Sequence, residues 1–290
     1  IRSPVFNGGA GQGSFLVLQN GVPTRSPAFG NVNMLMETHH EVARWVDAVR
    51  GPGSARYGSN SVHGLIDFEL PWTTKNGTDI TVSASTLSRA RGDLVTGNGE
   101  QVMGLSLQHD AGWRNDTSVD QQKLYLATAV EVAGWTGQAW LSAVNLNQET
   151  GGFVQGPNAY EDEALSEANA NPEAFRDAQF AMAAIDLNRS FGEYDVSVTP
   201  YARWQEMEFR QHFLPYKGYE ENSHSAFGVM GDVSSGFGNL DWTIGGMVDA
   251  ASGDLLETQP APFGFFPGDS RFPVGVHYDY TVDTLALALW

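Results

Sequence analysis

The fold of this chain is decided by Val46-Asp47-Ala48-Val49-Arg50-Gly51-Pro52-Gly53-Ser54-Ala55-Arg56-Tyr57-Gly58-Ser59-Asn60-Ser61-Val62-His63-Gly64-Leu65-Ile66. Apolar residues stand on both sides of a turn region that is rich in Gly, Ser and Asn. Glycine permits positive φ angles and close backbone approach, and Pro52 stiffens the first turn. The stretch therefore predicts two short strands joined by a tightly specified turn. It holds no nucleophile paired with a base and no complete phosphate-loop spacing, so a catalytic loop is not predicted.

Several motifs in and before this stretch resemble one family. The end of the plug domain in TonB-dependent outer-membrane receptors is similar to Val49-Arg50-Gly51-Pro52, Tyr57-Gly58-Ser59-Asn60-Ser61 and Gly64-Leu65-Ile66-Asp67. Asn20-Gly21-Val22-Pro23 stands where the family has Asp-Gly-Val-Pro, so Asn20 and Asp67 are mild departures. The resemblance implies a plug inside a barrel, and it gives a structural role to Arg50, Gly51, Pro52, Tyr57, Gly58 and Gly64.

Composition restricts the class of protein. The chain has 34 acidic and 16 basic residues, a formal net charge of -18, which argues against a nucleic-acid partner because nucleic acids need a basic face. The acidic excess fits either a solvated surface or divalent cations that bridge lipopolysaccharide. The sequence has no apolar run long enough for a transmembrane helix. The mean hydropathy of -0.27 is compatible with a transmembrane β-barrel, whose alternating strands hide a lipid face from window averages.

The first 72 residues are dense in Gly and Pro and predict a small α+β unit. Short strands are expected at Phe15–Leu18, Val46–Val49 and Leu65–Leu70, with a short helix within Asn33–Trp45. The glycine run from Gly8 to Gly13 has the wrong spacing for a dinucleotide site and is interpreted as a turn.

From about Thr78 the sequence predicts ten strands of alternating character. They are expected near residues 78–85, 87–95, 100–110, 119–132, 138–148, 176–189, 194–210, 225–234, 240–250 and 278–290. After the first hairpin, short and long connections alternate. An antiparallel meander then carries tight turns at one end and long loops at the other, which is typical of outer-membrane barrels.

Face patterns support this interpretation. In the seventh strand, one parity is apolar and ends at a girdle tryptophan, whereas the other parity is polar and suits an aqueous lumen. The apolar set is Val196, Val198, Pro200, Ala202 and Trp204. The last strand is ambiguous, because Tyr278, Tyr280 and Trp290 share one parity and Leu285, Leu287 and Leu289 share the other. Half-buried strands of a large soluble sheet remain an alternative.

Ten strands do not make a barrel that holds the plug. With strands about 4.8 Å apart and tilted by about 45°, ten strands close at a radius of roughly 11 Å and 22 strands at roughly 24 Å. A unit of about 70 residues itself has a radius of gyration of roughly 11 Å. We therefore expect a membrane β fold: a plug at 1–72 with an incomplete N-terminus, and at 73–290 an antiparallel transmembrane β-barrel fragment of about 10 of an expected 22 strands.

Ligand contact is expected at the plug apex and the upper lumen, where a solute from outside meets the protein. Small-ligand pockets mix aromatic side chains with a few polar anchors. The candidates are Arg25 and Phe29 on the plug, the inward-facing Tyr201, Arg203, Gln205 and Met207, and His212, Glu220, Glu221 and His224 in the loop above them. Plug–barrel salt bridges formed by Arg203 and the glutamates remain an equal alternative.

No cofactor and no dedicated metal site are predicted. His39 and His40 are adjacent and cannot both face one ion from a strand, and His212 and His224 lack a short ligand spacing. The acidic run Tyr160–Glu163 is interpreted as a solvated loop rather than a Ca²⁺ site. The aromatic segment Pro260–Pro273 either folds over a ligand or packs on neighbouring loops.

The resemblance implies a receptor in the Gram-negative outer membrane that takes up a scarce solute, such as an iron–siderophore or other metal chelate. Its partners would be the TonB energy-coupling complex, which engages an N-terminal plug segment, the chelate, and a bilayer that contains lipopolysaccharide. The alternative is a passive channel or surface-binding barrel; the 1–72 unit distinguishes the two, because a simple porin lacks such a unit. No Ser–His–acid set or carboxylate pair stands at inward positions, so the chain is not expected to be an enzyme.

Overall fold

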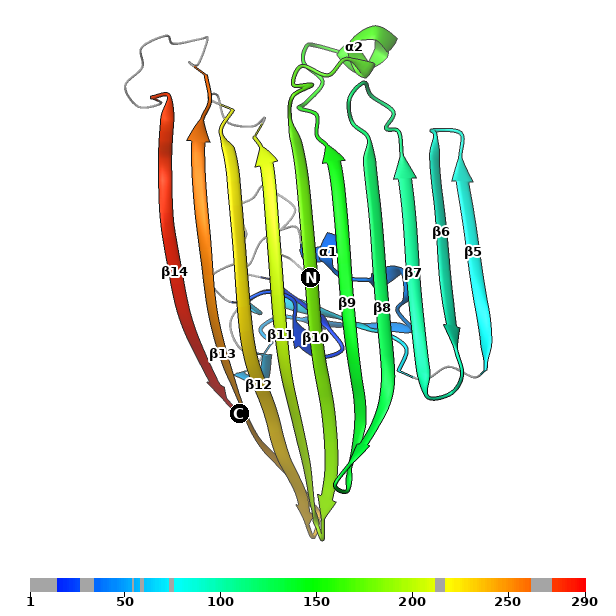
Figure 1. Ribbon diagram of the computed structural model, residues 1–290, viewed down its shortest axis with the longest axis vertical. Coiled ribbons are helices and arrows are strands. Elements are labelled where there is room, and N and C mark those ends of the chain that lie inside the picture. The colour runs from blue at the N-terminus through cyan, green and yellow to red at the C-terminus, as the bar shows by residue number, and fades with distance from the viewer. Residues whose placement is uncertain are drawn as a thin grey trace.

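The computed structural model describes residues 15–26, 34–53, 55–57, 60–72, 76–211, 217–261 and 273–290. It contains a four-stranded sheet in the order β2-β1-β4-β3 and a ten-stranded sheet in the order β14 to β5 (Figure 1). We call the described residues 15–72 the plug and the ten-stranded sheet the wall.

The plug has the three strands that the sequence predicts, namely β1 (Leu16–Gln19), β3 (Trp45–Arg50) and β4 (Gly64–Glu69), and a fourth that it does not, β2 (Val22–Pro23). β1 runs parallel to β4, while β3 runs antiparallel to it. The expected helix is confirmed as α1 (Met34–Glu37), followed by a 3₁₀ turn at His40–Val42. No helix in the described part of the chain is long and apolar enough to cross a membrane.

The glycine-rich turn between β3 and β4 is held in shape by glycine backbone angles and by a backbone hydrogen bond across it. Gly51 and Gly64 have φ angles of 97° and 145°, which favour glycine. Gly53 donates its N–H to the carbonyl of Ser61 at 2.8 Å, and a Cβ at Gly53 would lie 2.8 Å from the Ser61 Cβ. Tyr57 packs against the buried leucines of β1 and β4, whereas Gly58 lies outside the described residues.

All ten predicted strands of the wall are present in one antiparallel meander. Its strands are β5 (Gly77–Ser85), β6 (Arg89–Gly97), β7 (Gln101–Asp110), β8 (Val119–Val132), β9 (Trp135–Glu149), β10 (Phe175–Phe191), β11 (Tyr194–Arg210), β12 (Tyr219–Phe237), β13 (Leu240–Gln259) and β14 (Gly275–Leu289). After the first hairpin, whose tight β5–β6 turn lies at the upper end in Figure 1, the tight turns lie at the lower end and the long connections at the upper end, as predicted.

Two strand boundaries were predicted wrongly. β12 begins at Tyr219 and β13 continues to Gln259, so Glu220, Glu221 and His224 lie in a strand and not in a loop. These polar residues have low intrinsic strand preference, but β11 and β13 pair with them on both sides, and such pairing overrides propensity.

The long loop between β9 and β10 is anchored to its neighbour. Arg114 donates to the carbonyls of Gly152 and Ala168, and Asn169 donates to the carbonyl of Asp116 at 2.8 Å. In the acidic run, the Asp162 carboxylate caps α2 (Glu163–Glu167) by accepting from the Leu165 N–H. The aromatic segment predicted at 260–273 falls almost wholly outside the described residues.

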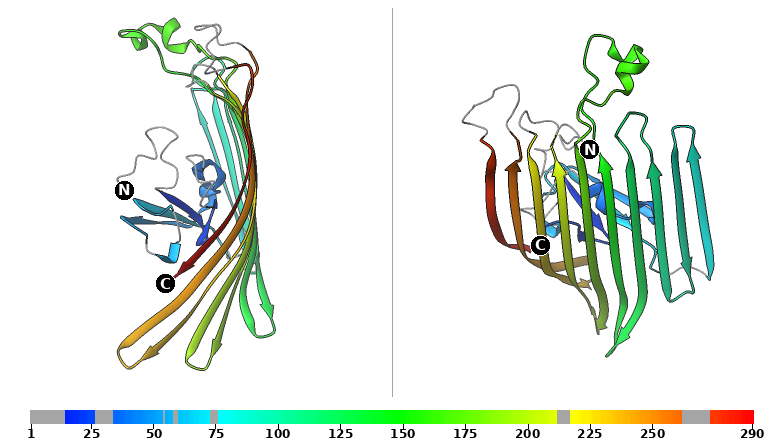
Figure 2. Two further views of the ribbon diagram at one scale, coloured as in Figure 1. Left: turned by 90° about the vertical axis from the view of Figure 1, so that its left-hand side faces the viewer. Right: turned by 45° about the horizontal axis from the view of Figure 1, so that its top comes forward.

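The plug lies against the concave face of the curved wall (Figure 2). One hydrophobic cluster joins them, with Val22, Val42 and Leu70 from the plug packed among wall residues such as Tyr125 and Phe180. Plug and wall therefore share a core.

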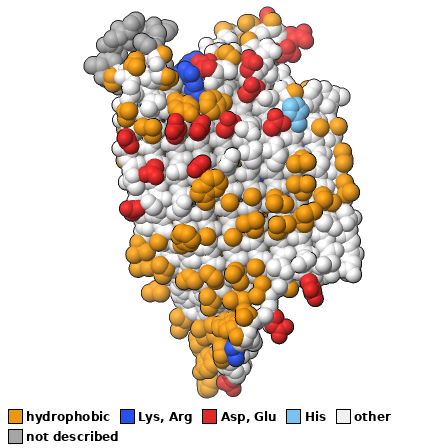
Figure 3. All heavy atoms as spheres, viewed as in Figure 1, with side chains coloured by type: hydrophobic (Ala, Val, Ile, Leu, Met, Phe, Trp, Pro, Cys, Tyr) orange, Lys and Arg blue, Asp and Glu red, His pale blue; other side chains and the backbone are white. Residues whose placement is uncertain are grey.

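The convex face carries a broad band of apolar side chains (Figure 3). Aromatic pairs lie near its tight-turn end: the ring centroids of Trp135 and Phe191 are 5.9 Å apart, and those of Tyr194 and Trp242 are 6.2 Å apart. From Tyr194 to Trp204, β11 rises about 33 Å, or about 25 Å along the membrane normal at the usual tilt. That height matches the lipid-facing band of outer-membrane barrels.

Strand pairing resolves the ambiguous last strand. Asp249 of β13 is buried on the plug side and pairs directly with Ala286 of β14, so Ala286 also faces the plug side. Leu285, Leu287 and Leu289 have the opposite parity and are exposed on the convex face.

Candidate functional site

One polar contact between plug and wall is built around Arg203 of β11. Its guanidinium donates to the Pro23 carbonyl oxygen at 2.6 Å and to the Ser26 Oγ at 2.7 Å, and it forms an ion pair with Asp249. The Asp249 carboxylate also accepts from the Ser26 hydroxyl and the Tyr201 hydroxyl, each at 2.9 Å. We call Arg203, Asp249, Tyr201, Pro23 and Ser26 the first clamp.

Local geometry explains why the first clamp forms there. Residues 201 and 203 share a face of β11 because side chains alternate along a strand. The Arg203 guanidinium lies 5.1 Å from the centroid of the Tyr201 ring. The ring in turn lies over Gly228 of β12, where any Cβ would come within 2.1 Å of it. The glycine therefore lets the tyrosine lie across its neighbour and support the arginine.

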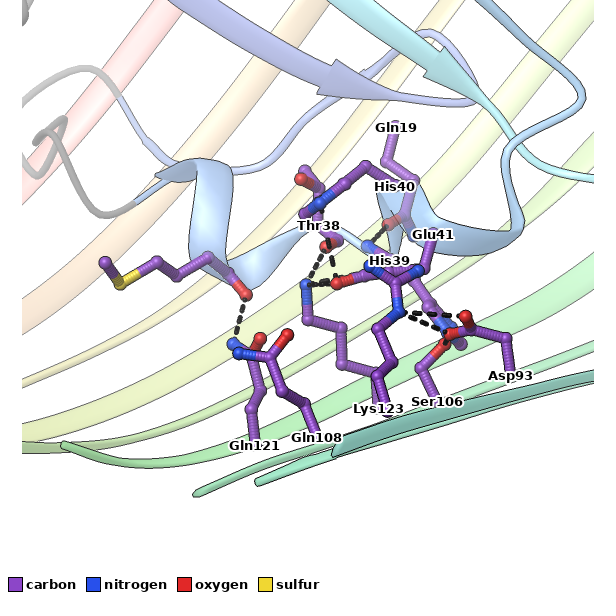
Figure 4. Close-up of polar contacts among 12 residues, drawn as sticks. Gln19, Thr38, His39, His40, Glu41, Asp93, Ser106, Gln108, Gln121 and Lys123 are labelled. Atoms are coloured by element: carbon purple, nitrogen blue, oxygen red, sulfur yellow. Dashed lines mark hydrogen bonds and ion pairs between the residues drawn. The ribbon is translucent and has the colours of Figure 1, made fainter. Parts of the chain in front are cut away.

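A second clamp joins the plug to β6, β7 and β8 (Figure 4). Lys123, which is 1% exposed, donates to the Thr38 carbonyl at 2.8 Å and forms an ion pair with Glu41 at 2.9 Å. Beside it, the Nε2 of His39 lies 2.8 Å from the Ser106 Oγ. The Ser106 hydroxyl donates to Asp93 at 2.6 Å. We call these six residues, Thr38, His39 and Glu41 of the plug and Asp93, Ser106 and Lys123 of the wall, the second clamp.

The protonation state of His39 follows from this chain of contacts. The Ser106 hydroxyl gives its proton to Asp93, so it accepts a hydrogen bond from the Nε2–H of His39. Burial lowers the pKa of His39 to about 4, so the imidazole is neutral near pH 7. In a catalytic triad the histidine lies between the acid and the serine, whereas here the serine lies in the middle. The arrangement therefore holds the plug and does not activate a nucleophile.

Both clamps hold the segments that flank residues 27–33. Arg25 and Glu37, on either side of that segment, form a buried ion pair with each other. The backbone N–H of His39 also donates to the Gln19 side chain at 3.1 Å. Phe29, a predicted ligand residue, lies in this segment, outside the described residues.

The two departures from the family motif both take part in plug contacts. Asn20 donates its side-chain amide to the Tyr125 hydroxyl of β8 at 3.2 Å, a bond for which an aspartate has no donor. Asp67 accepts from the Gly21 N–H at 3.1 Å, and burial raises its pKa to about 6. Next to it, burial and the Asp67 charge raise the pKa of Glu69 to about 7.

The predicted ligand residues divide into four groups. Arg25, Tyr201 and Arg203 are buried where plug and wall meet. This burial favours a structural role for Arg203, as in the alternative of a plug–barrel salt bridge. Its ion pair, however, is with Asp249 of the wall and not with a plug residue. Gln205, Met207, Glu220 and His224 share the inner face near the long-loop end. Glu221 is exposed and has the parity of the convex face, and His212 lies outside the described residues.

Sequence reasoning missed Asp249, Ser26, Lys123, Glu41 and the His39–Ser106 contact. A signal existed for the wall residues, since Lys123 and Asp249 are charged residues at inward parity in otherwise uncharged strand segments. Among the described residues, no three His, Asp or Glu side chains are grouped closely enough to hold a metal ion.

A depression of about 710 Å³ lies where β6 to β9 cross the apolar band. Met103, Leu126 and Leu141 line it, and all have the parity of the convex face. It opens away from the plug, so it is not the predicted solute site.

No protein-family model and no curated protein matches this sequence. Solved structures do match. The unliganded ferric citrate transporter FecA superposes with a TM-score of 0.72 at 14% identity, over 96% of this chain and 44% of that one. The chain has the fold of the TonB-dependent receptors.

Two further structures support that assignment of fold. The ferripyoverdine receptor of the Pseudomonas aeruginosa outer membrane gives a TM-score of 0.69 at 8% identity, over 94% of this chain and 42% of that one. The siderophore receptor PiuA from Acinetobacter baumannii gives 0.64 at 11% identity, over 94% and 45%. The chain thus spans slightly under half the length of these three proteins, which are transport proteins and not enzymes.

Proposed function

We propose that this chain belongs to a receptor of the Gram-negative outer membrane that takes up a scarce solute by energy-coupled transport. The observation that carries the proposal is the plug on the concave face of the wall, held by two buried polar clamps. The apolar band on the convex face supports a place in the bilayer. The structural neighbours, which include siderophore receptors, support an iron–siderophore or other metal chelate as solute.

The clamps explain why transport would need external work. Hydrogen bonds to charged groups contribute about 1.5–3 kcal/mol each, and several of them join plug to wall. A solute opens the plug only by as much as it prefers the open state. We therefore propose that an inner-membrane energy-coupling complex of the TonB type pulls on the N-terminal part of the plug.

The solute would bind above the plug, on the inner face near the long loops. Gln205, Met207, Glu220 and His224 lie on that face, and Arg25 and Phe29 flank or lie in the segment between the clamps. Arg203 and Tyr201 would act indirectly, since they hold that segment in place. A passive channel is the weaker alternative because the plug obstructs the concave side of the wall.

Uptake of radiolabelled ferric chelates by cells that express the complete protein tests this proposal. We expect accumulation in cells with a working energy-coupling complex and none in cells that lack it. Equal accumulation in both strains would contradict energy coupling and favour a passive channel.

A further inference from the structure

The inner face of β11 to β13 near the long loops carries an excess of hydrogen-bond acceptors. Glu220 of β12 and Glu257 of β13 stand directly opposite each other, where like charges repel. Gln205, Gln211 and Gln259 lie beside them and are 0%, 4% and 1% exposed. We call these five residues the acceptor cluster.

The first hydrogen-bond chain fixes the orientation of one glutamine. Asn222 donates its amide to the Glu220 carboxylate at 2.8 Å, so its side-chain oxygen faces the other way. That oxygen accepts from the Gln205 amide at 3.2 Å. Because the chain ends in a carboxylate, which only accepts, the Gln205 Oε1 is left buried and without a partner.

The other two glutamines are oriented in the same way. Gln211 donates to Glu257 at 3.0 Å, and Gln259 donates to the Ala261 carbonyl at 2.8 Å. Both acceptors are unable to donate, so the Oε1 atoms of Gln211 and Gln259 are also buried and unpaired. Three oriented oxygens therefore lack donors around two facing carboxylates.

The described residues supply little positive charge here. The His277 ring lies between two acceptors, with Nδ1 3.3 Å from a Glu257 oxygen and Nε2 2.8 Å from the Pro273 carbonyl oxygen. The arginines of the first clamp region, Arg203 and Arg25, are paired with Asp249 and Glu37. In the part of the chain that the structure describes, no lysine or arginine forms an ion pair with Glu220.

We infer that the acceptor cluster is a subsite for an ammonium or guanidinium group of the transported solute. Such a group brings one positive charge and several N–H donors, which the facing carboxylates and the unpaired glutamine oxygens would accept. A carboxylate or phosphate would be repelled there. The inference rests on the proposed function, since it specifies which part of a solute the lumen takes.

Binding of spermidine to the complete protein in detergent, measured by calorimetry at low ionic strength, tests the inference. We expect saturable binding, and we expect the double variant Glu220→Gln/Glu257→Gln to weaken it by about tenfold or more. The matched control Glu206→Gln/Glu208→Gln makes the same change in charge on the exposed convex side of the adjacent strand. It should leave the affinity unchanged.

A second variant keeps the charge constant. Gln259→Leu removes one unpaired oxygen without changing the net charge, and about threefold weaker binding is expected. An equal loss of spermidine affinity in the control Glu206→Gln/Glu208→Gln would show that spermidine binds only through the overall acidic charge of the protein. That result would overturn the inference. Undetectable spermidine binding, or full affinity in the Glu220/Glu257 variant, would overturn it too and would leave water as the partner of these oxygens.

The uptake assay separates the two proposals. Energy-coupled uptake without spermidine binding refutes the subsite and leaves the receptor function standing. The opposite result is spermidine binding that depends on Glu220 and Glu257, combined with uptake that is equal with and without the energy-coupling complex. It refutes the receptor function and leaves a lumen that binds cations.

Discussion

Arg203→Ala is the sharpest perturbation of the first clamp. The side chain is fully buried and reaches from β11 to two plug atoms, the Pro23 carbonyl at 2.6 Å and the Ser26 Oγ at 2.7 Å. It also neutralises Asp249, which is 1% exposed. We expect the variant to insert normally and to hold its plug more loosely.

The magnitude follows from these contacts. Two hydrogen bonds from a charged donor to the plug are lost, each worth about 1.5–3 kcal/mol. Breaking a buried ion pair typically costs about 3–5 kcal/mol, and opening the plug relieves part of that cost because water then reaches Asp249. Docking should therefore weaken by at least about 3 kcal/mol, which is about a hundredfold in the population of open plug.

Hydrogen exchange in detergent micelles measures this population. The reporters are two bonds inside the plug, from the Thr24 N–H to the Val17 carbonyl and from the Asn20 N–H to the Phe68 carbonyl. Because the plug shares its core with the wall, undocking exposes that core and these bonds open with it. Both amides should exchange about a hundredfold faster in Arg203→Ala. Arg189→Ala is the control, because that arginine binds the Ala133 carbonyl in an exposed turn. Unchanged protection of the two plug amides in Arg203→Ala would refute the reasoning.

Three further predictions concern plug stability and the membrane face. Glu69→Gln should be more stable than the wild type near pH 8 and about equally stable near pH 5. The reason is that the pKa of Glu69 is raised in the folded plug, so the wild type loses stability as the pH rises from about 4.5 to about 7. Urea unfolding at both pH values checks this, and a difference in stability that is the same at both would contradict it. Lys123→Met should destabilise the plug by about 3–5 kcal/mol, because it leaves the Glu41 charge buried without its partner. Adding Glu41→Gln to this variant should restore much of the lost stability in the same urea assay. If the two substitutions instead destabilise the plug additively, the ion pair does not stabilise it. Val198→Arg, in the apolar band, should destabilise the wall in the membrane by about 2–4 kcal/mol and reduce the fraction of protein assembled there. Normal assembly of this variant would show that the convex face does not contact lipid.

Much of the wall could be predicted because its signals are local. Alternation along β11 separated Val196 to Trp204 from the lumen side, and tight turns marked the strand ends. The strand start at Tyr219 was missed for the opposite reason: Glu220 to His224 are strand residues only because β11 and β13 pair with them. Propensity does not contain that information.

The clamps were beyond sequence reasoning because their partners are far apart in the chain. Arg203 and Ser26 are separated by 177 residues, and Lys123 and Glu41 by 82. Parity shows that Arg203 faces inward but does not show which atom it meets. The unpaired oxygens of the acceptor cluster were equally hidden, since each depends on where a neighbouring hydrogen-bond chain ends.

The central claim is that the plug closes the lumen and must move for transport. Val42 of the plug packs against Gly104 of β7, where an added Cβ would lie 3.1 Å from one Val42 methyl and 3.5 Å from the other. Those distances place a Val42→Cys/Gly104→Cys pair within reach of a disulfide, and the chain has no other cysteine. We predict that energy-coupled uptake stops when this pair is oxidised and returns when it is reduced. Undiminished uptake by the fully oxidised protein would contradict the account.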